Sequence, residues 1–142
     1  MKRILVALDG SSRAQTVLAA AARMAELANA KLVLFRAIGV PSDMPREILN
    51  LMDRRLEDVL VGSAHAELER LAATLPKERV ERIATPFATA WDGICRIARE
   101  LDVDLIVIGS HGYGGMDRVL GTTAAKVVNH ADRNVLVVRT QL

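Results

Sequence analysis

Aromatic residues, cysteine and net charge are all scarce in this sequence, and each shortage excludes a class of protein. Only 3% of the 142 residues are aromatic, so the core must be aliphatic and rich in alanine. A surface that binds single-stranded nucleic acid would need aromatic platforms and clustered basic residues. Here the net charge is only +2 and the basic residues are scattered, so we expect no nucleic-acid partner. The single Cys95 excludes an internal disulfide and a cysteine-based metal site.

Long apolar runs are also lacking. The opening segment MKRILVALDG has an apolar run that is too short for a signal peptide or a membrane span. We therefore expect a cytoplasmic protein without a membrane partner. The length, with 51% hydrophobic and 25% charged residues, suits one globular domain over residues 1–142 with a sizeable core.

The chain does contain short apolar runs, which alternate with segments whose apolar residues follow helical spacing. Nearly continuous aliphatic runs predict buried strands at 3–8, 31–38, 105–108 and 134–139, and an alternating run at 80–85 predicts an edge strand. Apolar residues at helical spacing predict helices at 11–28, 46–75 and 89–101, and a further one from about 120. The first helix is expected to use Ser11 or Ser12 as its N-cap. The second is expected to turn Met52, Leu56 and Val59 toward the core.

This order of elements predicts an α/β fold with a doubly wound, five-stranded parallel sheet and helices on both faces. The expected strand order is 3-2-1-4-5. Strands 1 and 4 are then neighbours whose crossovers leave in opposite directions, and ligands bind outside the carboxyl ends of the strands at such a switch point. Asp9 ends the first strand and Gly109 ends the fourth. The fold therefore brings the two unusual turns of the chain to one place.

The segment from Asp104 to Thr123 combines a strand, a glycine-rich loop and the start of a helix. Its glycines are Gly109, Gly112, Gly114, Gly115 and Gly121. Glycines let backbone N–H groups approach an anion closely, and a helix N-terminus adds further donors. The segment is thus typical of phosphate binding. The alternative is an ordinary flexible turn between a strand and a helix.

Several well-known signatures do not fit this loop. A Walker loop needs a lysine after its last glycine, whereas Gly121 is followed by two threonines. The pair Gly112 and Gly114 does not complete a dinucleotide fingerprint, because position 117 is aspartate. The histidines are far apart and lack zinc-ligand spacing. Ser110 is not flanked as in a hydrolase nucleophile motif.

Three segments resemble the universal stress protein family, the UspA superfamily. They are the opening Ile4–Ser11, the loop with Gly109-Ser110-His111-Gly112 and Gly121-Thr122, and the closing Val135–Arg139. The resemblance covers the whole chain and implies an α/β fold of the adenine nucleotide alpha hydrolase-like kind. The nucleotide-binding branch of the family carries G-x2-G-x9-G-[ST]. Here only eight residues, 113–120, separate Gly112 from Gly121, so the loop is one residue shorter.

The resemblance implies an adenine-nucleotide site, for ATP or for AMP or ADP and with Mg²⁺ as a possible companion. Its residues would be Ala7, Asp9, Ala37, Ile108, Gly109, His111, Gly112, Arg118, Gly121, Thr122 and Thr123. Asp9 would contact the adenine or ribose, and the backbone of Ala37 would meet adenine. The glycines and threonines would cradle the phosphates, and Arg118 would neutralise them.

Each of these roles has an alternative. Asp9 is equally well explained as a carboxylate of the turn and helix cap. Ala7, Ala37 and Ile108 are equally well explained as core residues. The two threonines are also typical of a helix cap, and His111 of an exposed loop residue. Lys126, one turn into the last helix, suits a solvated face.

The resemblance implies a stress-response protein that binds nucleotide as a regulatory module, with at most slow ATP hydrolysis or autophosphorylation. One alternative is a nucleotide-free interaction dimer, and another is an enzyme that transfers an adenylyl or phosphoryl group. The fifth strand has no later strand to pair with, so it is expected at the sheet edge. A homodimer through Val135, Leu136, Val137 and Val138 is therefore the expected assembly.

Overall fold

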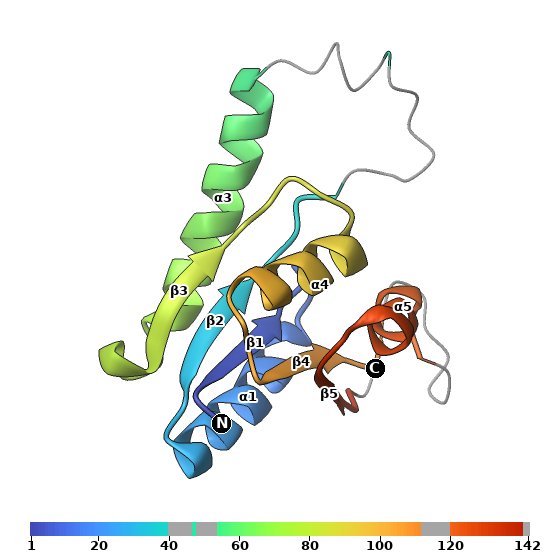
Figure 1. The fold of residues 1–142 in the computed structure, drawn as a ribbon. Helices are drawn as coiled ribbons and strands as arrows, with labels where there is room; N and C mark the ends of the chain where they lie inside the picture. Colours follow the sequence, from blue (N-terminus) through green and yellow to red (C-terminus); the bar gives the residue numbers. More distant parts are fainter. Residues whose placement is uncertain (40–46, 48–53, 112–119, 141–142) are drawn as a thin grey trace.

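The computed structural model describes residues 1–39, 47, 54–111 and 120–140, and its centre is a parallel five-stranded sheet (Figure 1). The strand order is β3-β2-β1-β4-β5, as the sequence predicts. The strands are β1 (Arg3–Ala7), β2 (Lys31–Phe35), β3 (Val80–Ala84), β4 (Leu105–Gly109) and β5 (Asn134–Val138). The predicted doubly wound α/β fold is therefore confirmed.

Two pairs of helices cover the two faces of the sheet. The helices are α1 (Ala14–Ala28), α3 (Arg54–Ala72), α4 (Ala90–Glu100) and α5 (Thr122–His130), with a short 3-10 turn at Lys77–Arg79. Successive residues of a strand point to opposite faces. Accordingly Ile4 and Val6 pack into the cluster with α1 and α3, whereas Leu5 packs into the cluster with α4 and α5. Both faces of the central strands are buried, which explains their continuous aliphatic runs.

The start of α1 differs from the prediction. Its N-cap is Arg13, without a side-chain capping bond, so the prediction of Ser11 or Ser12 is wrong. Ser11 belongs instead to the turn before the helix, because its backbone N and its Oγ both bond to the Asp9 carboxylate. Its Oγ then accepts a bond of 3.2 Å from the backbone N of Arg13. The end of α1 is as expected, with Asn29 in the left-handed conformation at φ 51°.

The prediction that α3 buries its first turns is also wrong. Leu68, in the second half of the helix, is 1% exposed, whereas Leu56 and Val59 are 49% and 66% exposed. Figure 1 shows the reason, since the early turns of α3 extend past the carboxyl end of β3 and lie beyond the sheet. Apolar spacing predicts a helical face but not whether a partner lies opposite it. Met52, assigned to the same face, lies outside the described residues.

Strand β2 is shorter than predicted and ends at Phe35 instead of Ile38. The chain continues alongside the segment after β3, where Ile38 N donates to Pro86 O at 2.9 Å and Ala88 N donates to Ile38 O at 3.1 Å. Pro86 has no N–H to offer a ladder. The regular pairing therefore stops before it, with one isolated bridge between Ile38 and Phe87 beyond.

Two further features of the described chain bear on earlier expectations. Cys95 is only 7% exposed, and burial raises the pKa of its thiol, so it is a packing residue and not a reactive one. Of the helices in the described ranges, none has the length and apolarity to cross a bilayer.

Candidate functional site

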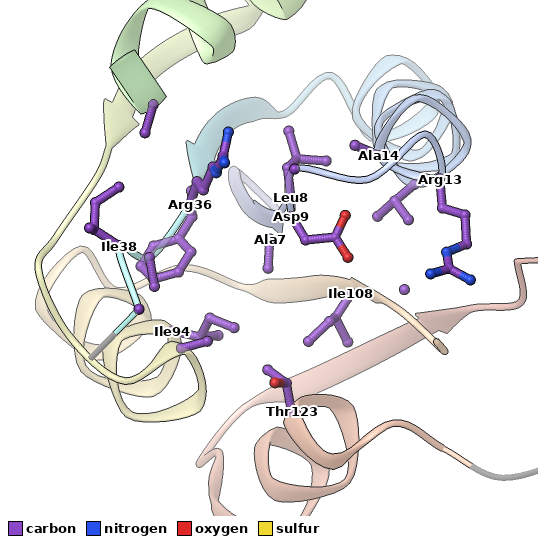
Figure 2. Close-up of a pocket in the computed structure, with 18 of the residues that line it drawn as sticks. Ala7, Leu8, Asp9, Arg13, Ala14, Arg36, Ile38, Ile94, Ile108 and Thr123 are labelled. Atoms are coloured by element: carbon purple, nitrogen blue, oxygen red, sulfur yellow. The ribbon is translucent and has the colours of Figure 1, made fainter. Parts of the chain in front are cut away.

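A cavity of about 510 Å³ opens at the carboxyl ends of β1, β2 and β4, where the fold places the switch point (Figure 2). Seven of the predicted site residues line it. They are Ala7, Asp9, Ala37, Ile108, Gly109, His111 and Thr123. They come from four separate parts of the chain, so the fold alone brings them together. Gly121 and Thr122 are not among the lining residues, and Gly112 and Arg118 lie outside the described residues.

Asp9 lines the cavity and takes part in the turn that follows β1. Its Oδ1 accepts bonds from Ser11 N at 3.0 Å and from Ser11 Oγ at 2.5 Å. The carboxylate is exposed and faces the cavity, as Figure 2 shows. Because one carboxylate oxygen holds the turn, the other is placed to accept a bond from a molecule in the cavity. Both interpretations of Asp9 are thus compatible with its geometry.

Gly109, the last residue of β4, is a point of close approach between the sheet and α1. A Cβ at this position would stand 3.0 Å from Val17 Cγ2 and 4.0 Å from Thr140 Cγ2. Glycine therefore lets α1 lie directly against the end of β4. The same feature leaves the backbone at the cavity wall uncovered by a side chain.

The start of α5 forms another part of the cavity wall. Gly121 is the N-cap, and its N–H donates to Ser110 O at 2.8 Å, which ties the helix start to the end of β4. Thr122 and Thr123 follow as the first helical residues, so neither is the cap. Thr123 lines the cavity, while Thr122 is exposed. Free backbone N–H groups in the first turn of a helix favour anions nearby.

His111 is buried, and not an exposed loop residue. It is 8% exposed, and its Nδ1 lies 2.8 Å from Thr140 Oγ1 and 3.1 Å from Ser110 Oγ. Ser110 Oγ also accepts a bond of 3.2 Å from Thr140 N. Ser110 and Thr140 are themselves 0% and 3% exposed. This polar cluster fixes the chain that leaves β4 against the chain that leaves β5.

Sequence reasoning missed Ser63 of α3 and three polar residues that follow strands, Arg13, Arg36 and Thr140, all of which line the cavity. Arg36 directly follows β2, and its guanidinium forms an ion pair with Glu67 of α3. Arg13 is the N-cap of α1, four residues after Asp9. The one available signal was position, because each of the three follows within a few residues of a strand's carboxyl end.

The cavity wall combines apolar surface with few charges. Ile94 and Ile108 lie on the side of α4, whereas Asp9 and Arg13 lie on the side of α1 (Figure 2). Phe35 also lines the cavity and belongs to the same core cluster as Ile94 and Ile108. Such a division suits a ligand with a flat apolar part and a charged part. In the part of the chain that the structure describes, no group of three or more histidine, cysteine, aspartate or glutamate side chains could hold a metal ion.

Outside the cavity, the outer faces of α4 and α5 meet through Trp91. Its ring lies 4.9 Å from that of His130, and Lys126 Nζ lies 5.4 Å from its centroid. Lys126 is exposed and does not line the cavity, in agreement with a solvated face.

Comparison with known proteins gives one family. The family model described as the universal stress protein family matches residues 1–139. "Universal stress protein A homolog 1" of Coxiella burnetii is 33% identical over 138 residues, which are 96% of this chain and 95% of the relative. The solved structure of universal stress protein UspA from Lactobacillus plantarum is 26% identical, covers 97% of each chain and has a TM-score of 0.75.

Two solved structures that share the fold contain adenine nucleotides. A universal stress protein in complex with cAMP is 24% identical, with 99% of this chain and 98% of that chain covered and a TM-score of 0.63. The universal stress protein from Archaeoglobus fulgidus in complex with dAMP is 23% identical, with 96% and 97% covered and a TM-score of 0.57. From the match along nearly its entire length, this chain belongs to the universal stress protein family.

Proposed function

We propose that this protein binds an adenine nucleotide, ATP in the first place, in the cavity at the ends of β1 and β4. The observation that carries the proposal is the convergence of Asp9, Gly109 and Thr123 on one cavity at the topological switch point. A doubly wound sheet binds its ligands at this place. The presence of cAMP and dAMP in two proteins of the same fold supports an adenine nucleotide as the ligand.

The division of the cavity wall indicates how the nucleotide would lie. The adenine would occupy the side of Phe35, Ala37 and Ile108, and Asp9 would accept a bond from the ribose or the base. The phosphates would lie against Gly109 and Thr123, where backbone N–H groups at the start of α5 favour negative charge. Gly121 and Thr122 would contribute to phosphate binding indirectly, because they hold the start of α5 in place.

Mg²⁺, if it accompanies the nucleotide, would depend mainly on the phosphates. Asp9 is the one carboxylate among the described cavity-lining residues. Mg²⁺ keeps several waters and needs few protein ligands when phosphates supply the others. The residues present therefore fit an ion that arrives with ATP, and not a resident metal.

We propose a regulatory role in the cytoplasm and not rapid catalysis. The buried His111 is held by two hydroxyl groups, which suits a structural part in the site. Cys95, the single cysteine, is buried and cannot form an internal disulfide, as is usual for proteins of a reducing compartment. The alternative of an adenylyl- or phosphoryl-transfer enzyme would be supported if the turnover of wild type were well above that of an Asp9→Ala variant.

The assembly that we propose is a homodimer through β5. This strand lies at the edge of the sheet, and its residues Val135–Val138 are half-buried in the single chain. Val135 and Val137 pack on one core cluster and Leu136 and Val138 on the other. An uncovered aliphatic edge invites pairing with a second copy. Sedimentation should give a dimer at micromolar concentration, and Leu136→Lys or Val138→Lys should give a monomer or an unstable protein.

The nucleotide proposal is tested by identifying what the purified protein carries. Mass spectrometry of molecules released by denaturation should find ATP, ADP or AMP, and calorimetry of the stripped protein should measure its return. If no nucleotide is released and none binds at millimolar concentration, the nucleotide-free interaction dimer is the better account. Sedimentation of the same sample then tests that alternative directly.

A further inference from the structure

We propose that Arg13 reads the number of phosphates on the bound nucleotide, so that the site prefers a nucleoside di- or triphosphate to a monophosphate or a cyclic monophosphate. This inference rests on the proposed nucleotide function and adds the specificity of the same site. Arg13 lies outside the glycine loop in sequence, and no phosphate-binding motif of the chain contains it.

The position of Arg13 follows from the contact between α1 and Gly109. Val17 Cγ2 would stand 3.0 Å from a Cβ at Gly109, so this part of α1 lies against the end of β4. Arg13 and Val17 are joined by one helical turn, with Val17 N donating to Arg13 O at 3.2 Å. Side chains four residues apart share a helix face. Arg13 therefore lies one turn above this contact, at the cavity end of α1.

The side chain of Arg13 extends from this turn toward the ends of β4 and β5, as Figure 2 shows, and it lines the cavity together with Gly109 and Thr123. It is partly exposed, so it lies at the rim and not at the bottom. A phosphate chain that starts at Gly109 and leads outward would reach it. A single phosphate held at Thr123 and Gly109 would not need it.

The charge of Arg13 is available to a ligand, whereas that of Arg36, the other arginine among the described lining residues, is not. Arg36 is paired with Glu67. Within the described ranges, no ion pair and no side-chain hydrogen bond of Arg13 is formed. A positive charge without a carboxylate partner at the cavity rim favours a negatively charged part of a ligand beside it. A guanidinium binds phosphate oxygens through two parallel bonds, which makes it suitable for a terminal phosphate.

The test compares affinities for AMP, ADP and ATP by calorimetry in wild type, Arg13→Gln and Arg13→Lys. The matched control is Arg23→Gln, which removes the same charge from an exposed position of α1 away from the cavity. Arg13→Gln should weaken ATP binding by roughly tenfold and AMP binding by less than about twofold. Arg13→Lys should restore part of the preference, because it keeps the charge but not the fork. The control should bind all three nucleotides as wild type does.

The outcomes separate this inference from the proposed function. If wild type binds adenine nucleotides and Arg13→Gln weakens AMP and ATP equally, or neither, the phosphate-counting role is overturned while the nucleotide site stands. If wild type binds none of the three, the proposed function itself fails and the role of Arg13 fails with it. An unchanged melting temperature of Arg13→Gln shows that a loss of ATP affinity does not arise from unfolding.

Discussion

The two ends of the sheet use arginine in opposite ways. At the amino ends of the strands, Arg133 Nη1 donates to the carbonyls of Ala98 and Val103 at 2.8 and 2.9 Å, and Arg79 Nη1 donates to the carbonyl of Ala30 at 2.8 Å. At the carboxyl ends, Arg13 lines a cavity of about 510 Å³ and forms no such bonds within the described chain.

This difference separates stability from binding in one small fold. Arg3, Arg79 and Arg133 each begin or directly precede a strand, and each joins loops that are distant in sequence. Their bonds satisfy carbonyl groups where helices end and strands begin. Groups that can bind a ligand lie at the carboxyl ends of the strands, where the crossovers leave β1 and β4 in opposite directions. Substitutions at the two ends should therefore affect different quantities.

The largest effect on stability is expected from Arg133→Ala. The side chain of Arg133 is 14% exposed and donates to Ala98 O and Val103 O, and Asp132 raises the pKa of its guanidinium. Its removal leaves two partly buried carbonyls without their charged donor, so the free energy of unfolding should fall by about 3 kcal/mol. Urea denaturation measures the loss, and nucleotide affinity of the folded protein should not change.

Arg99→Ala is the control for this prediction. Arg99 Nε lies 3.7 Å from Asp132 Oδ2, but the Arg99 side chain is 63% exposed. An exposed pair contributes little, so the loss should be about 0.5 kcal/mol or less. Equal losses for the two variants would contradict the view that burial and carbonyl bonding make Arg133 important.

The second prediction concerns the close contact at the cavity edge. Gly109→Ala would place a Cβ 3.0 Å from Val17 Cγ2 and push α1 away from β4. Overpacking of this kind should lower the free energy of unfolding by about 2 kcal/mol and should also weaken nucleotide binding. Thermal denaturation and calorimetry measure the two effects on the same sample.

Two other glycines give matched controls for this substitution. At Gly10 the atoms nearest to the Cβ would belong to the Arg36 guanidinium, with Nη2 at 2.8 Å, and this flexible end of a side chain can move aside. At Gly62, inside α3, nothing lies within 4 Å, and alanine should raise the free energy of unfolding by about 1 kcal/mol. If Gly109→Ala behaves as Gly62→Ala does, the contact with α1 is not tight in solution.

The third prediction separates the two parts that Asp9 plays at this end. Asp9→Ala should lower nucleotide affinity by about 1.4 kcal/mol, a factor of ten, and should lower the melting temperature slightly because the bonds to Ser11 are lost. Asp9→Asn keeps an acceptor for Ser11 N and should lower affinity with a smaller effect on melting. A fall in stability with unchanged affinity would assign Asp9 to the turn alone.

The sequence is sufficient to predict the strand order and the place of the cavity, but it does not predict the arginine bonds at the amino ends of the strands. Strand order and the meeting of Asp9 with Gly109 follow from the direction of βαβ crossovers, which depends on backbone geometry and not on side-chain detail. The burial of Cys95 agrees with its place beside the apolar Ile94 in α4.

The errors arise where a side-chain contact, or the lack of a packing neighbour, overrides the pattern of the local sequence. Leu56 and Val59 keep a helical apolar spacing, yet the sheet does not extend beneath them. Ser11 bonds Asp9 and so does not cap α1. His111 is buried because Thr140, near the far end of the chain, lies beside it. No periodicity encodes such pairings.

The smallest expected effect is a pH dependence that belongs to the amino ends of the strands. Asp104 accepts bonds from Lys2 N at 2.6 Å and Arg3 N at 2.9 Å, and these backbone bonds hold the pKa of its carboxyl below the ordinary value of about 3.9. Hydrogen bonding to Arg3 likewise lowers the pKa of Glu81. A carboxyl whose folded pKa lies below its unfolded pKa stabilises the fold above the unfolded value, and this stability is lost as the pH falls through the folded value.

Unfolding free energy should thus be constant between about pH 6 and pH 7 with respect to these two groups and should fall below about pH 4. Because Asp104 is exposed, solvent screening reduces its share to on the order of 0.5 kcal/mol. Asp104→Asn should reduce the difference in unfolding free energy between pH 7 and pH 3 by that amount, measured by urea denaturation at both values. A difference that equals that of wild type would show that the two backbone bonds do not depend on the charge. It would also weaken the contrast between a stabilising amino end and a binding carboxyl end, because the bonds of Asp104 tie the amino end of β1 to that of β4.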